Sequence, residues 1–103
     1  MKLIQRLSEH ISEEIHDARC YAKWALEEKD AHRSLADTLY TLSTEEMRHM
    51  QMLHNEVTRI ITEYRQANGE PPASMLAVYD YLHKKQIDNA AEVKTLQSMY
   101  KEG

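Results

Sequence analysis

Two residues in the middle of the chain, Glu46 and His49, have the types and the spacing of a metal-binding pair. Residues three apart on a helix lie on one face, one turn from each other, so a carboxylate and an imidazole can hold one ion between them. Apolar residues repeat around them with a four-three spacing: Leu35, Leu39, Leu42, Leu53, Val57, Ile60 and Tyr64. Continuing that spacing through the gap reaches Glu46 and His49. The pattern therefore predicts that Glu46 and His49, although ionisable, occupy positions that face the core.

A third ionisable residue, Glu14, interrupts the apolar spacing of the first segment. That spacing runs through Ile4, Leu7, Ile11, Ala18, Tyr21 and Ala25. It predicts a first helix over about 2–29, and the second pattern predicts a helix over about 34–66. The short polar connection between them predicts an antiparallel hairpin, which can bring Glu14 beside the pair. An unpaired carboxylate in such a core is costly, so we expect a partner, water or a metal ion to compensate it.

Carboxylate oxygens with an imidazole favour iron or manganese, with zinc as an alternative. One hairpin offers one Glu and one Glu-x-x-His, whereas binuclear carboxylate bundles use twice that set. Two copies related by a two-fold axis would supply it, and their four carboxylates would balance two divalent ions. We therefore predict a homodimer whose four-helix bundle forms from two hairpins, with the metals at the subunit interface.

The remainder of the chain predicts one more helix, over about 74–100. Asn68-Gly69 ends the second helix and Pro71-Pro72 prevents its continuation. The apolar stripe of the third helix is weaker than the first two, so it either packs across the hairpin or makes a subunit contact. Ser34 with Asp37 resembles a capping box for the second helix, with Asp30 as a rival N-cap. The fold class is all-α, as a single domain over residues 1–103.

Composition excludes several classes of function. The formal net charge is −4 and no basic cluster occurs, which argues against a nucleic-acid partner. No apolar run approaches the roughly 18 residues of a membrane span, and the N-terminus lacks the apolar region of a signal peptide. The single cysteine, Cys20, cannot form an internal disulfide, which fits a reducing compartment. These features predict a cytoplasmic protein.

The run Glu14-Ile-His-Asp-Ala-Arg-Cys-Tyr21, followed by Glu46-Met-Arg-His49, resembles the ferritin-like superfamily, most closely its rubrerythrin-like branch. The resemblance covers roughly residues 8–65. It implies a non-haem di-iron centre with Glu14, Glu46 and His49 as ligands, and ferroxidase- or peroxidase-type oxidation of ferrous iron by O₂ or peroxide. It also implies that Tyr21 lies near the irons as a hydrogen-bond or electron donor.

The chain departs from that family in length. Full members carry a second Glu and a second Glu-x-x-His on a third and fourth helix, and this chain has neither. It is similar instead to a half-bundle, as in encapsulated ferritins with two-helix subunits, although their capsid-targeting tail is not evident. With a single cysteine it also lacks the rubredoxin-type iron site of full rubrerythrins.

Two other functions remain open from the sequence: a non-catalytic iron-binding or iron-sensing module with the same ligands, and a metal-free helical dimer or adaptor. Minor candidates each have two interpretations. His83 is either an outer-shell or access-path ligand or a boundary histidine, and Glu56 is either part of an access path or solvated. The methionines Met47, Met50 and Met52, with Cys20, are interpreted as packing residues.

Overall fold

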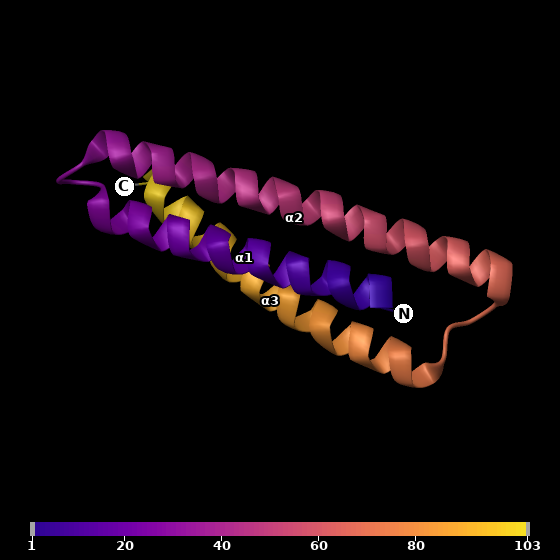
Figure 1. Ribbon diagram of the computed structural model, residues 1–103. Helices are drawn as coiled ribbons and strands as arrows, with labels where there is room; N and C mark the ends of the chain where they lie inside the picture. Colours follow the sequence, from indigo (N-terminus) through magenta and orange to yellow (C-terminus); the bar gives the residue numbers. More distant parts are fainter. Residues whose placement is uncertain (1, 103) are drawn as a thin grey trace.

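The computed structural model describes residues 2–102, which form three helices joined by two short connections (Figure 1). They are α1 (Lys2–Glu28), α2 (Arg33–Asn68) and α3 (Ala73–Glu102). The three helices run alternately up and down, and the molecule measures 56 × 20 × 18 Å. No strand occurs in this range. The all-α prediction is confirmed, and each helix begins and ends within two residues of its predicted limits.

The connection between α1 and α2 is closed by backbone hydrogen bonds rather than by the predicted side-chain cap. His32 is the N-cap residue and its side chain makes no capping bond. Its amide donates to the Glu28 carbonyl at 2.8 Å. The capping box at Ser34 and Asp37, and the rival cap at Asp30, are therefore wrong. The helix begins before Ser34, and the Asp37 carboxylate instead accepts a hydrogen bond from the hydroxyl of Tyr100.

The connection between α2 and α3 follows the predicted stop signal. Gly69 has a φ of 78°, a left-handed conformation that glycine adopts without strain. Its amide donates to the Arg65 carbonyl at 2.9 Å, which closes the last turn of α2. Two prolines follow, and α3 starts directly after them. The turn therefore fixes where α3 begins its return along the hairpin.

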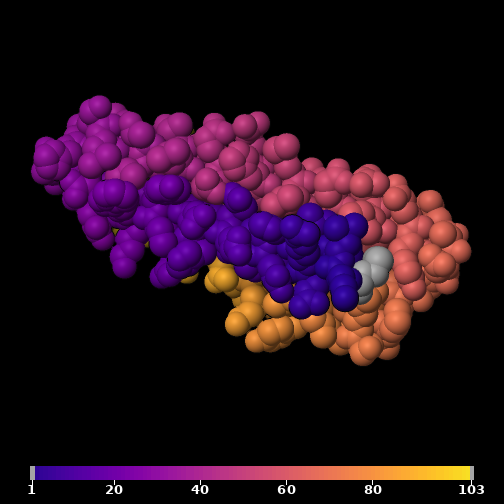
Figure 2. Space-filling model, in the orientation of Figure 1, coloured from indigo at the N-terminus to yellow at the C-terminus, as the bar shows by residue number. Residues whose placement is uncertain are grey.

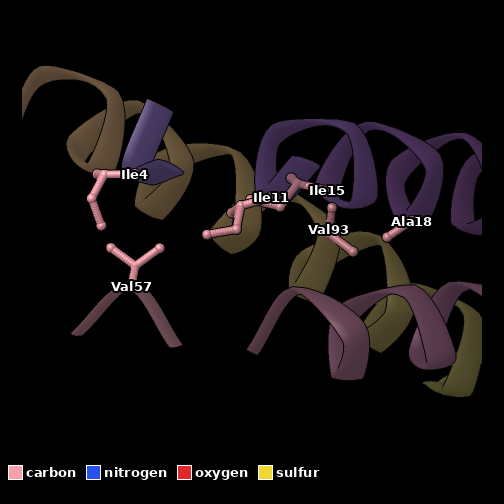
Figure 3. Packing of buried hydrophobic residues seen from close by; sticks show 6 residues of the cluster. All are labelled: Ile4, Ile11, Ile15, Ala18, Val57 and Val93. Carbon is pink, nitrogen blue, oxygen red and sulfur yellow. The ribbon is translucent and has the colours of Figure 1, made fainter. Parts of the chain in front are cut away.

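The core lies between α1 and α2 and is extended by α3. One cluster of buried residues comes from all three helices (Figure 3): Ile4, Ile11, Ile15, Ala18, Val57 and Val93. A second cluster lies at the end where the α1–α2 turn meets the C-terminus: Ala25, Ala36, Leu39 and Tyr100. Tyr40 stacks on Tyr100 there, with ring centroids 4.9 Å apart. These contacts join the end of α3 to the hairpin.

Polar contacts hold α3 against α1, which explains why its apolar stripe is weak. The buried Gln86 amide donates to the Ser8 carbonyl at 3.0 Å and to the Ser12 hydroxyl at 3.1 Å. Further along, the Gln97 amide donates to the Ser43 hydroxyl at 2.8 Å, and Ser43 donates to a backbone carbonyl of α1. Helix α3 packs mainly on α1 and touches α2 much less. It therefore covers one side of the hairpin only.

We expect Gln86→Ala to destabilise the chain by about 1–3 kcal/mol, because it leaves the buried Ser8 hydroxyl without its donor and removes side-chain volume. Urea unfolding measures this change. The matched control is Gln51→Ala, since Gln51 makes one exposed bond, to Asn55. That control should lie within about 0.5 kcal/mol of the parent chain. Equal effects of the two substitutions would contradict the role given to Gln86.

Candidate metal centre

The fold brings together all three metal ligands predicted from the sequence. Glu14 comes from α1, while Glu46 and His49 come from adjacent turns of α2. One ligand atom from each residue lies within 4.8 Å of the others. The His49 Nδ1 atom is 3.5 Å from the Glu14 Oε2 atom, within ion-pair distance but too long for a well-formed hydrogen bond. Two carboxylates and an imidazole therefore converge at one level of the hairpin.

The cluster lies at the edge of the hairpin, not inside it. The His49 side chain is 46% exposed and that of Glu14 is 24% exposed. The sequence pattern placed both at core positions, and for His49 this is wrong in the single chain. A four-three spacing drifts by about 20° per heptad around a straight helix. Because α3 covers only the opposite side, the drift leaves His49 facing outward.

The two carboxyl groups of the cluster repel each other when both are ionised. The pKa of Glu46 is raised from 4.5 to about 7. A hydrogen bond shared with the Glu14 carboxyl is the largest cause, followed by burial and by the negative charge of Glu14. Among the described residues, the buried Oε2 atom of Glu14 has no hydrogen-bond partner. A cation between the carboxylates would relieve both conditions, so the donor set fits a metal ion.

A consequence of this pKa is that the metal-free protein loses stability as the pH rises. The folded-state pKa of Glu46 lies above its ordinary value, so the stabilisation is complete below about pH 4.5 and is lost as the pH rises through about 7. His54 acts in the opposite sense, since burial and His83 lower its pKa. The comparison of the parent chain with Glu46→Gln isolates the Glu46 contribution, because both chains keep His54.

We expect the free energy of unfolding of the parent chain, relative to Glu46→Gln, to fall between about pH 5 and pH 8. Calorimetry in the presence of a chelator measures it. A difference that is constant or rises across this range would contradict the raised pKa of Glu46.

Exposed apolar side chains lie on the same face of the hairpin as the cluster, away from α3. At about 100° per residue, Ser12, which contacts α3, lies about 160° from Glu14 around α1. Trp24 lies about 80° from Glu14 on the other side, and Leu42 lies about 40° from Glu46. Trp24 is 46% exposed and Leu42 is 38% exposed. In Figure 2, α1 and α2 lie side by side, and little of the C-terminal part of α3 is visible from this side.

Exposure of this face would be costly for a lone chain. Other large apolar residues on the described surface are also exposed. By the same geometry, Leu3 lies about 20° from Glu14 around α1, and Leu35 about 20° from Glu46 around α2. We call the surface formed by Leu3, Trp24, Leu35 and Leu42 the open face, which is also the face that carries Glu14, Glu46 and His49. Grouped apolar residues around a polar cluster are typical of an interaction surface.

Tyr21 is not part of this cluster. It lies two turns after Glu14 on α1 and packs against the second core cluster near Ala25. No hydrogen bond between Tyr21 and the three ligands occurs in the described range. Its role as a donor near the metals remains a prediction of the family resemblance.

The minor candidates lie elsewhere. Glu56 binds Arg59, with an Nη2–Oε2 distance of 2.6 Å, and is therefore an exposed ion-pair residue. Cys20 is exposed with its sulfur 3.6 Å from His16, so its interpretation as a packing residue is wrong. Of the methionines, Met47 and Met50 pack against the first core cluster, as predicted, while Met52 is exposed.

Two features of the site region escaped the sequence analysis. Asp17 lies one turn after Glu14, and its charge contributes to the raised pKa of Glu46. The three-residue spacing between Glu14 and Asp17 could have predicted that the two carboxylates share a face of α1. His83 does not join the metal cluster but stacks on His54, with ring centroids 4.9 Å apart. No spacing within one helix could have predicted that contact, because the two residues come from α2 and α3.

Comparisons with protein-family models, with curated proteins and with solved structures return no match to this chain. Within residues 2–102, no helix has the length and apolar character needed to cross a membrane. The assignment of function therefore depends on the geometry of Glu14, Glu46 and His49.

Proposed function

We propose that this chain is one half of a binuclear carboxylate–histidine metal centre that oxidises ferrous iron with O₂ or peroxide. The observation that carries the proposal is the convergence of Glu14, Glu46 and His49 at a partly exposed edge of the hairpin. Three protein donors are too few to enclose one ion. An open edge at the donor set is what a site shared between two subunits requires.

A second copy of the chain is the partner that fits this face. Apposing two open faces about a two-fold axis would bury Trp24, Leu35 and Leu42 of both copies. It would also bring two sets of ligands together, as four carboxylates and two imidazoles. Four helices from two hairpins would then form the bundle, with α3 of each chain on its outside. Two-fold dimers are the commonest oligomers, so this arrangement needs no unusual symmetry.

The residues fit iron better than a soft metal. Carboxylate oxygens are hard ligands and imidazole is borderline, a combination that suits ferrous iron or manganese, with zinc as an alternative. Two divalent ions would neutralise the four carboxylates of a dimer. Binding would displace the proton that the raised pKa keeps on Glu46, so uptake should release protons near neutral pH.

In the proposed reaction ferrous iron is the substrate and supplies the redox chemistry. Two ferrous ions give two electrons, which with two protons reduce O₂ to hydrogen peroxide, or hydrogen peroxide to two water molecules. The chain positions the ions with Glu14, Glu46 and His49 and sets the charge of the site. Two ions held side by side allow both electrons to reach one oxidant.

The test is anaerobic loading with two ferrous ions per two chains, followed by O₂ or peroxide in a stopped-flow spectrometer. We expect ferric absorbance to rise faster than in protein-free buffer, and to fall to the buffer rate in Glu14→Ala. Loading without accelerated oxidation would favour the non-catalytic metal-binding module. No uptake of ferrous, manganous or zinc ions would favour the metal-free dimer or adaptor.

A further inference from the structure

A groove of about 380 Å³ lies between α2 and α3, on the side of the hairpin away from the open face. Ile11 and Ile15 of α1 form its floor, and Met47 and Met50 line it from α2. Two histidines, His54 and His83, line it from opposite helices. The groove exists because α3 packs on α1 and makes few contacts with α2.

The two imidazoles form an unusual pair. Their rings are 4.9 Å apart between centroids and are parallel within 9°. The Tyr79 ring also stacks on His83, with the two ring centroids 5.6 Å apart. No ring nitrogen of His54 or His83 has a hydrogen-bond or ion-pair partner within residues 2–102. Burial and the neighbouring His83 lower the pKa of His54, which favours the neutral form of its imidazole. Neutral imidazole is the form that binds metal ions.

The other residues that line the groove indicate which kind of metal ion the two imidazoles could bind. Among the described residues that line the groove there is no Asp or Glu, and the one charged side chain is the cationic Lys94. A hard divalent ion would therefore find no anionic ligand there. Met50 lies one turn before His54 on α2, so its thioether can face the same space. Thioether and imidazole together select soft, low-charge copper over iron, manganese or magnesium.

We propose that His54 and His83, with the Met50 thioether, bind cuprous copper in the groove between α2 and α3. Binding replaces the ring stack, as each imidazole turns a nitrogen toward the shared ion. Because the ligands come from two helices, the ion also links α3 to α2, where the fold has few contacts. This site is separate from Glu14, Glu46 and His49 in both position and ligand chemistry, and it does not depend on the proposed iron oxidation.

The test is a competition titration of the full chain with cuprous copper and a chromogenic cuprous chelator, without oxygen. All variants carry Cys20→Ser, because that exposed thiol would itself bind copper. We expect one copper per chain. His54→Gln and His83→Gln should each weaken binding by at least about tenfold, since even residues that only orient a ligand are worth about 10–100-fold. His32→Gln, an exposed histidine in the α1–α2 turn, is the matched control and should bind as the parent does.

A second measurement uses the Cys20→Ser chain with both histidines in place, and so does not depend on the stability of the glutamine variants. Silver(I), a redox-inert substitute for cuprous copper, should shift the imidazole nitrogen resonances of His54 and His83 and leave those of His10 and His32 in place. Copper affinity that is unchanged in both glutamine variants would overturn the proposal. Zinc bound at the same pair more tightly than cuprous copper would overturn the choice of metal. Glu46→Gln should leave copper affinity unchanged, which separates this result from any failure of the iron site.

Discussion

Glu46→Gln should change stability in opposite directions with and without metal. In the metal-free protein above about pH 7, the substitution removes the charge repulsion from Glu14 that raises the pKa of Glu46. The apparent melting temperature should therefore rise above that of the parent chain. With metal, the parent gains about 2.7 kcal/mol at a concentration one hundred times Kd, and the variant loses most of this gain. For a domain of this size, that gain raises the parent melting temperature by roughly 10 °C or more.

Thermal unfolding with a chelator and with excess manganese or zinc measures both effects without oxidation chemistry. Glu56→Gln is the matched control, because it removes a carboxylate from α2 that is exposed and paired with Arg59. It should show neither the gain without metal nor the loss with metal. A parent chain whose melting temperature does not respond to any of these ions would contradict the metal centre and favour the metal-free dimer.

Leu42→Arg should separate the two copies and remove metal binding together. Leu42 is 38% exposed on the open face and lies one turn before Glu46, so the proposed dimer buries it. A guanidinium there would be buried in the proposed interface, where the metal ions already hold the nearest carboxylates, those of Glu46. Burial of an unpaired charge costs several kcal/mol, enough to dissociate a dimer of moderate affinity. Metal uptake should fall in the same variant although all three ligands remain.

Sedimentation and metal content, measured on the same samples, report this result. Val78→Arg is the control, because Val78 is a more exposed apolar residue, at 59%, but lies on α3 away from the open face. That variant should remain dimeric and metal-bound. A Leu42→Arg monomer that still binds the full metal content would show that one chain completes the site alone.

The sequence was sufficient to predict the hairpin and to single out the three candidate ligands. The four-three spacings predicted α1 and α2, and Asn68-Gly69 with the two prolines predicted the start of α3. The interruption of both spacings at one level identified Glu14, Glu46 and His49, which the structure brings within 4.8 Å. These features are readable because helix periodicity and side-chain type are local properties.

The features that could not be predicted from the sequence all depend on how α3 packs against the hairpin. Its side of the hairpin is chosen by polar contacts such as Gln86 with Ser8, which leave little apolar periodicity to detect. That choice decides which face of the hairpin stays open, and hence that His49 is half exposed. It also creates the groove in which His54 meets His83. Contacts between residues far apart in the chain require the fold itself.

The most direct test of the central proposal is native mass spectrometry combined with elemental analysis of protein loaded without oxygen. We expect the parent chain to form a dimer that carries two metal ions per two chains. The Glu14→Ala variant, loaded in the same way, should carry no metal. A monomer that holds one ion, or a dimer that holds none after loading with iron, manganese or zinc, would contradict a binuclear site shared between two chains.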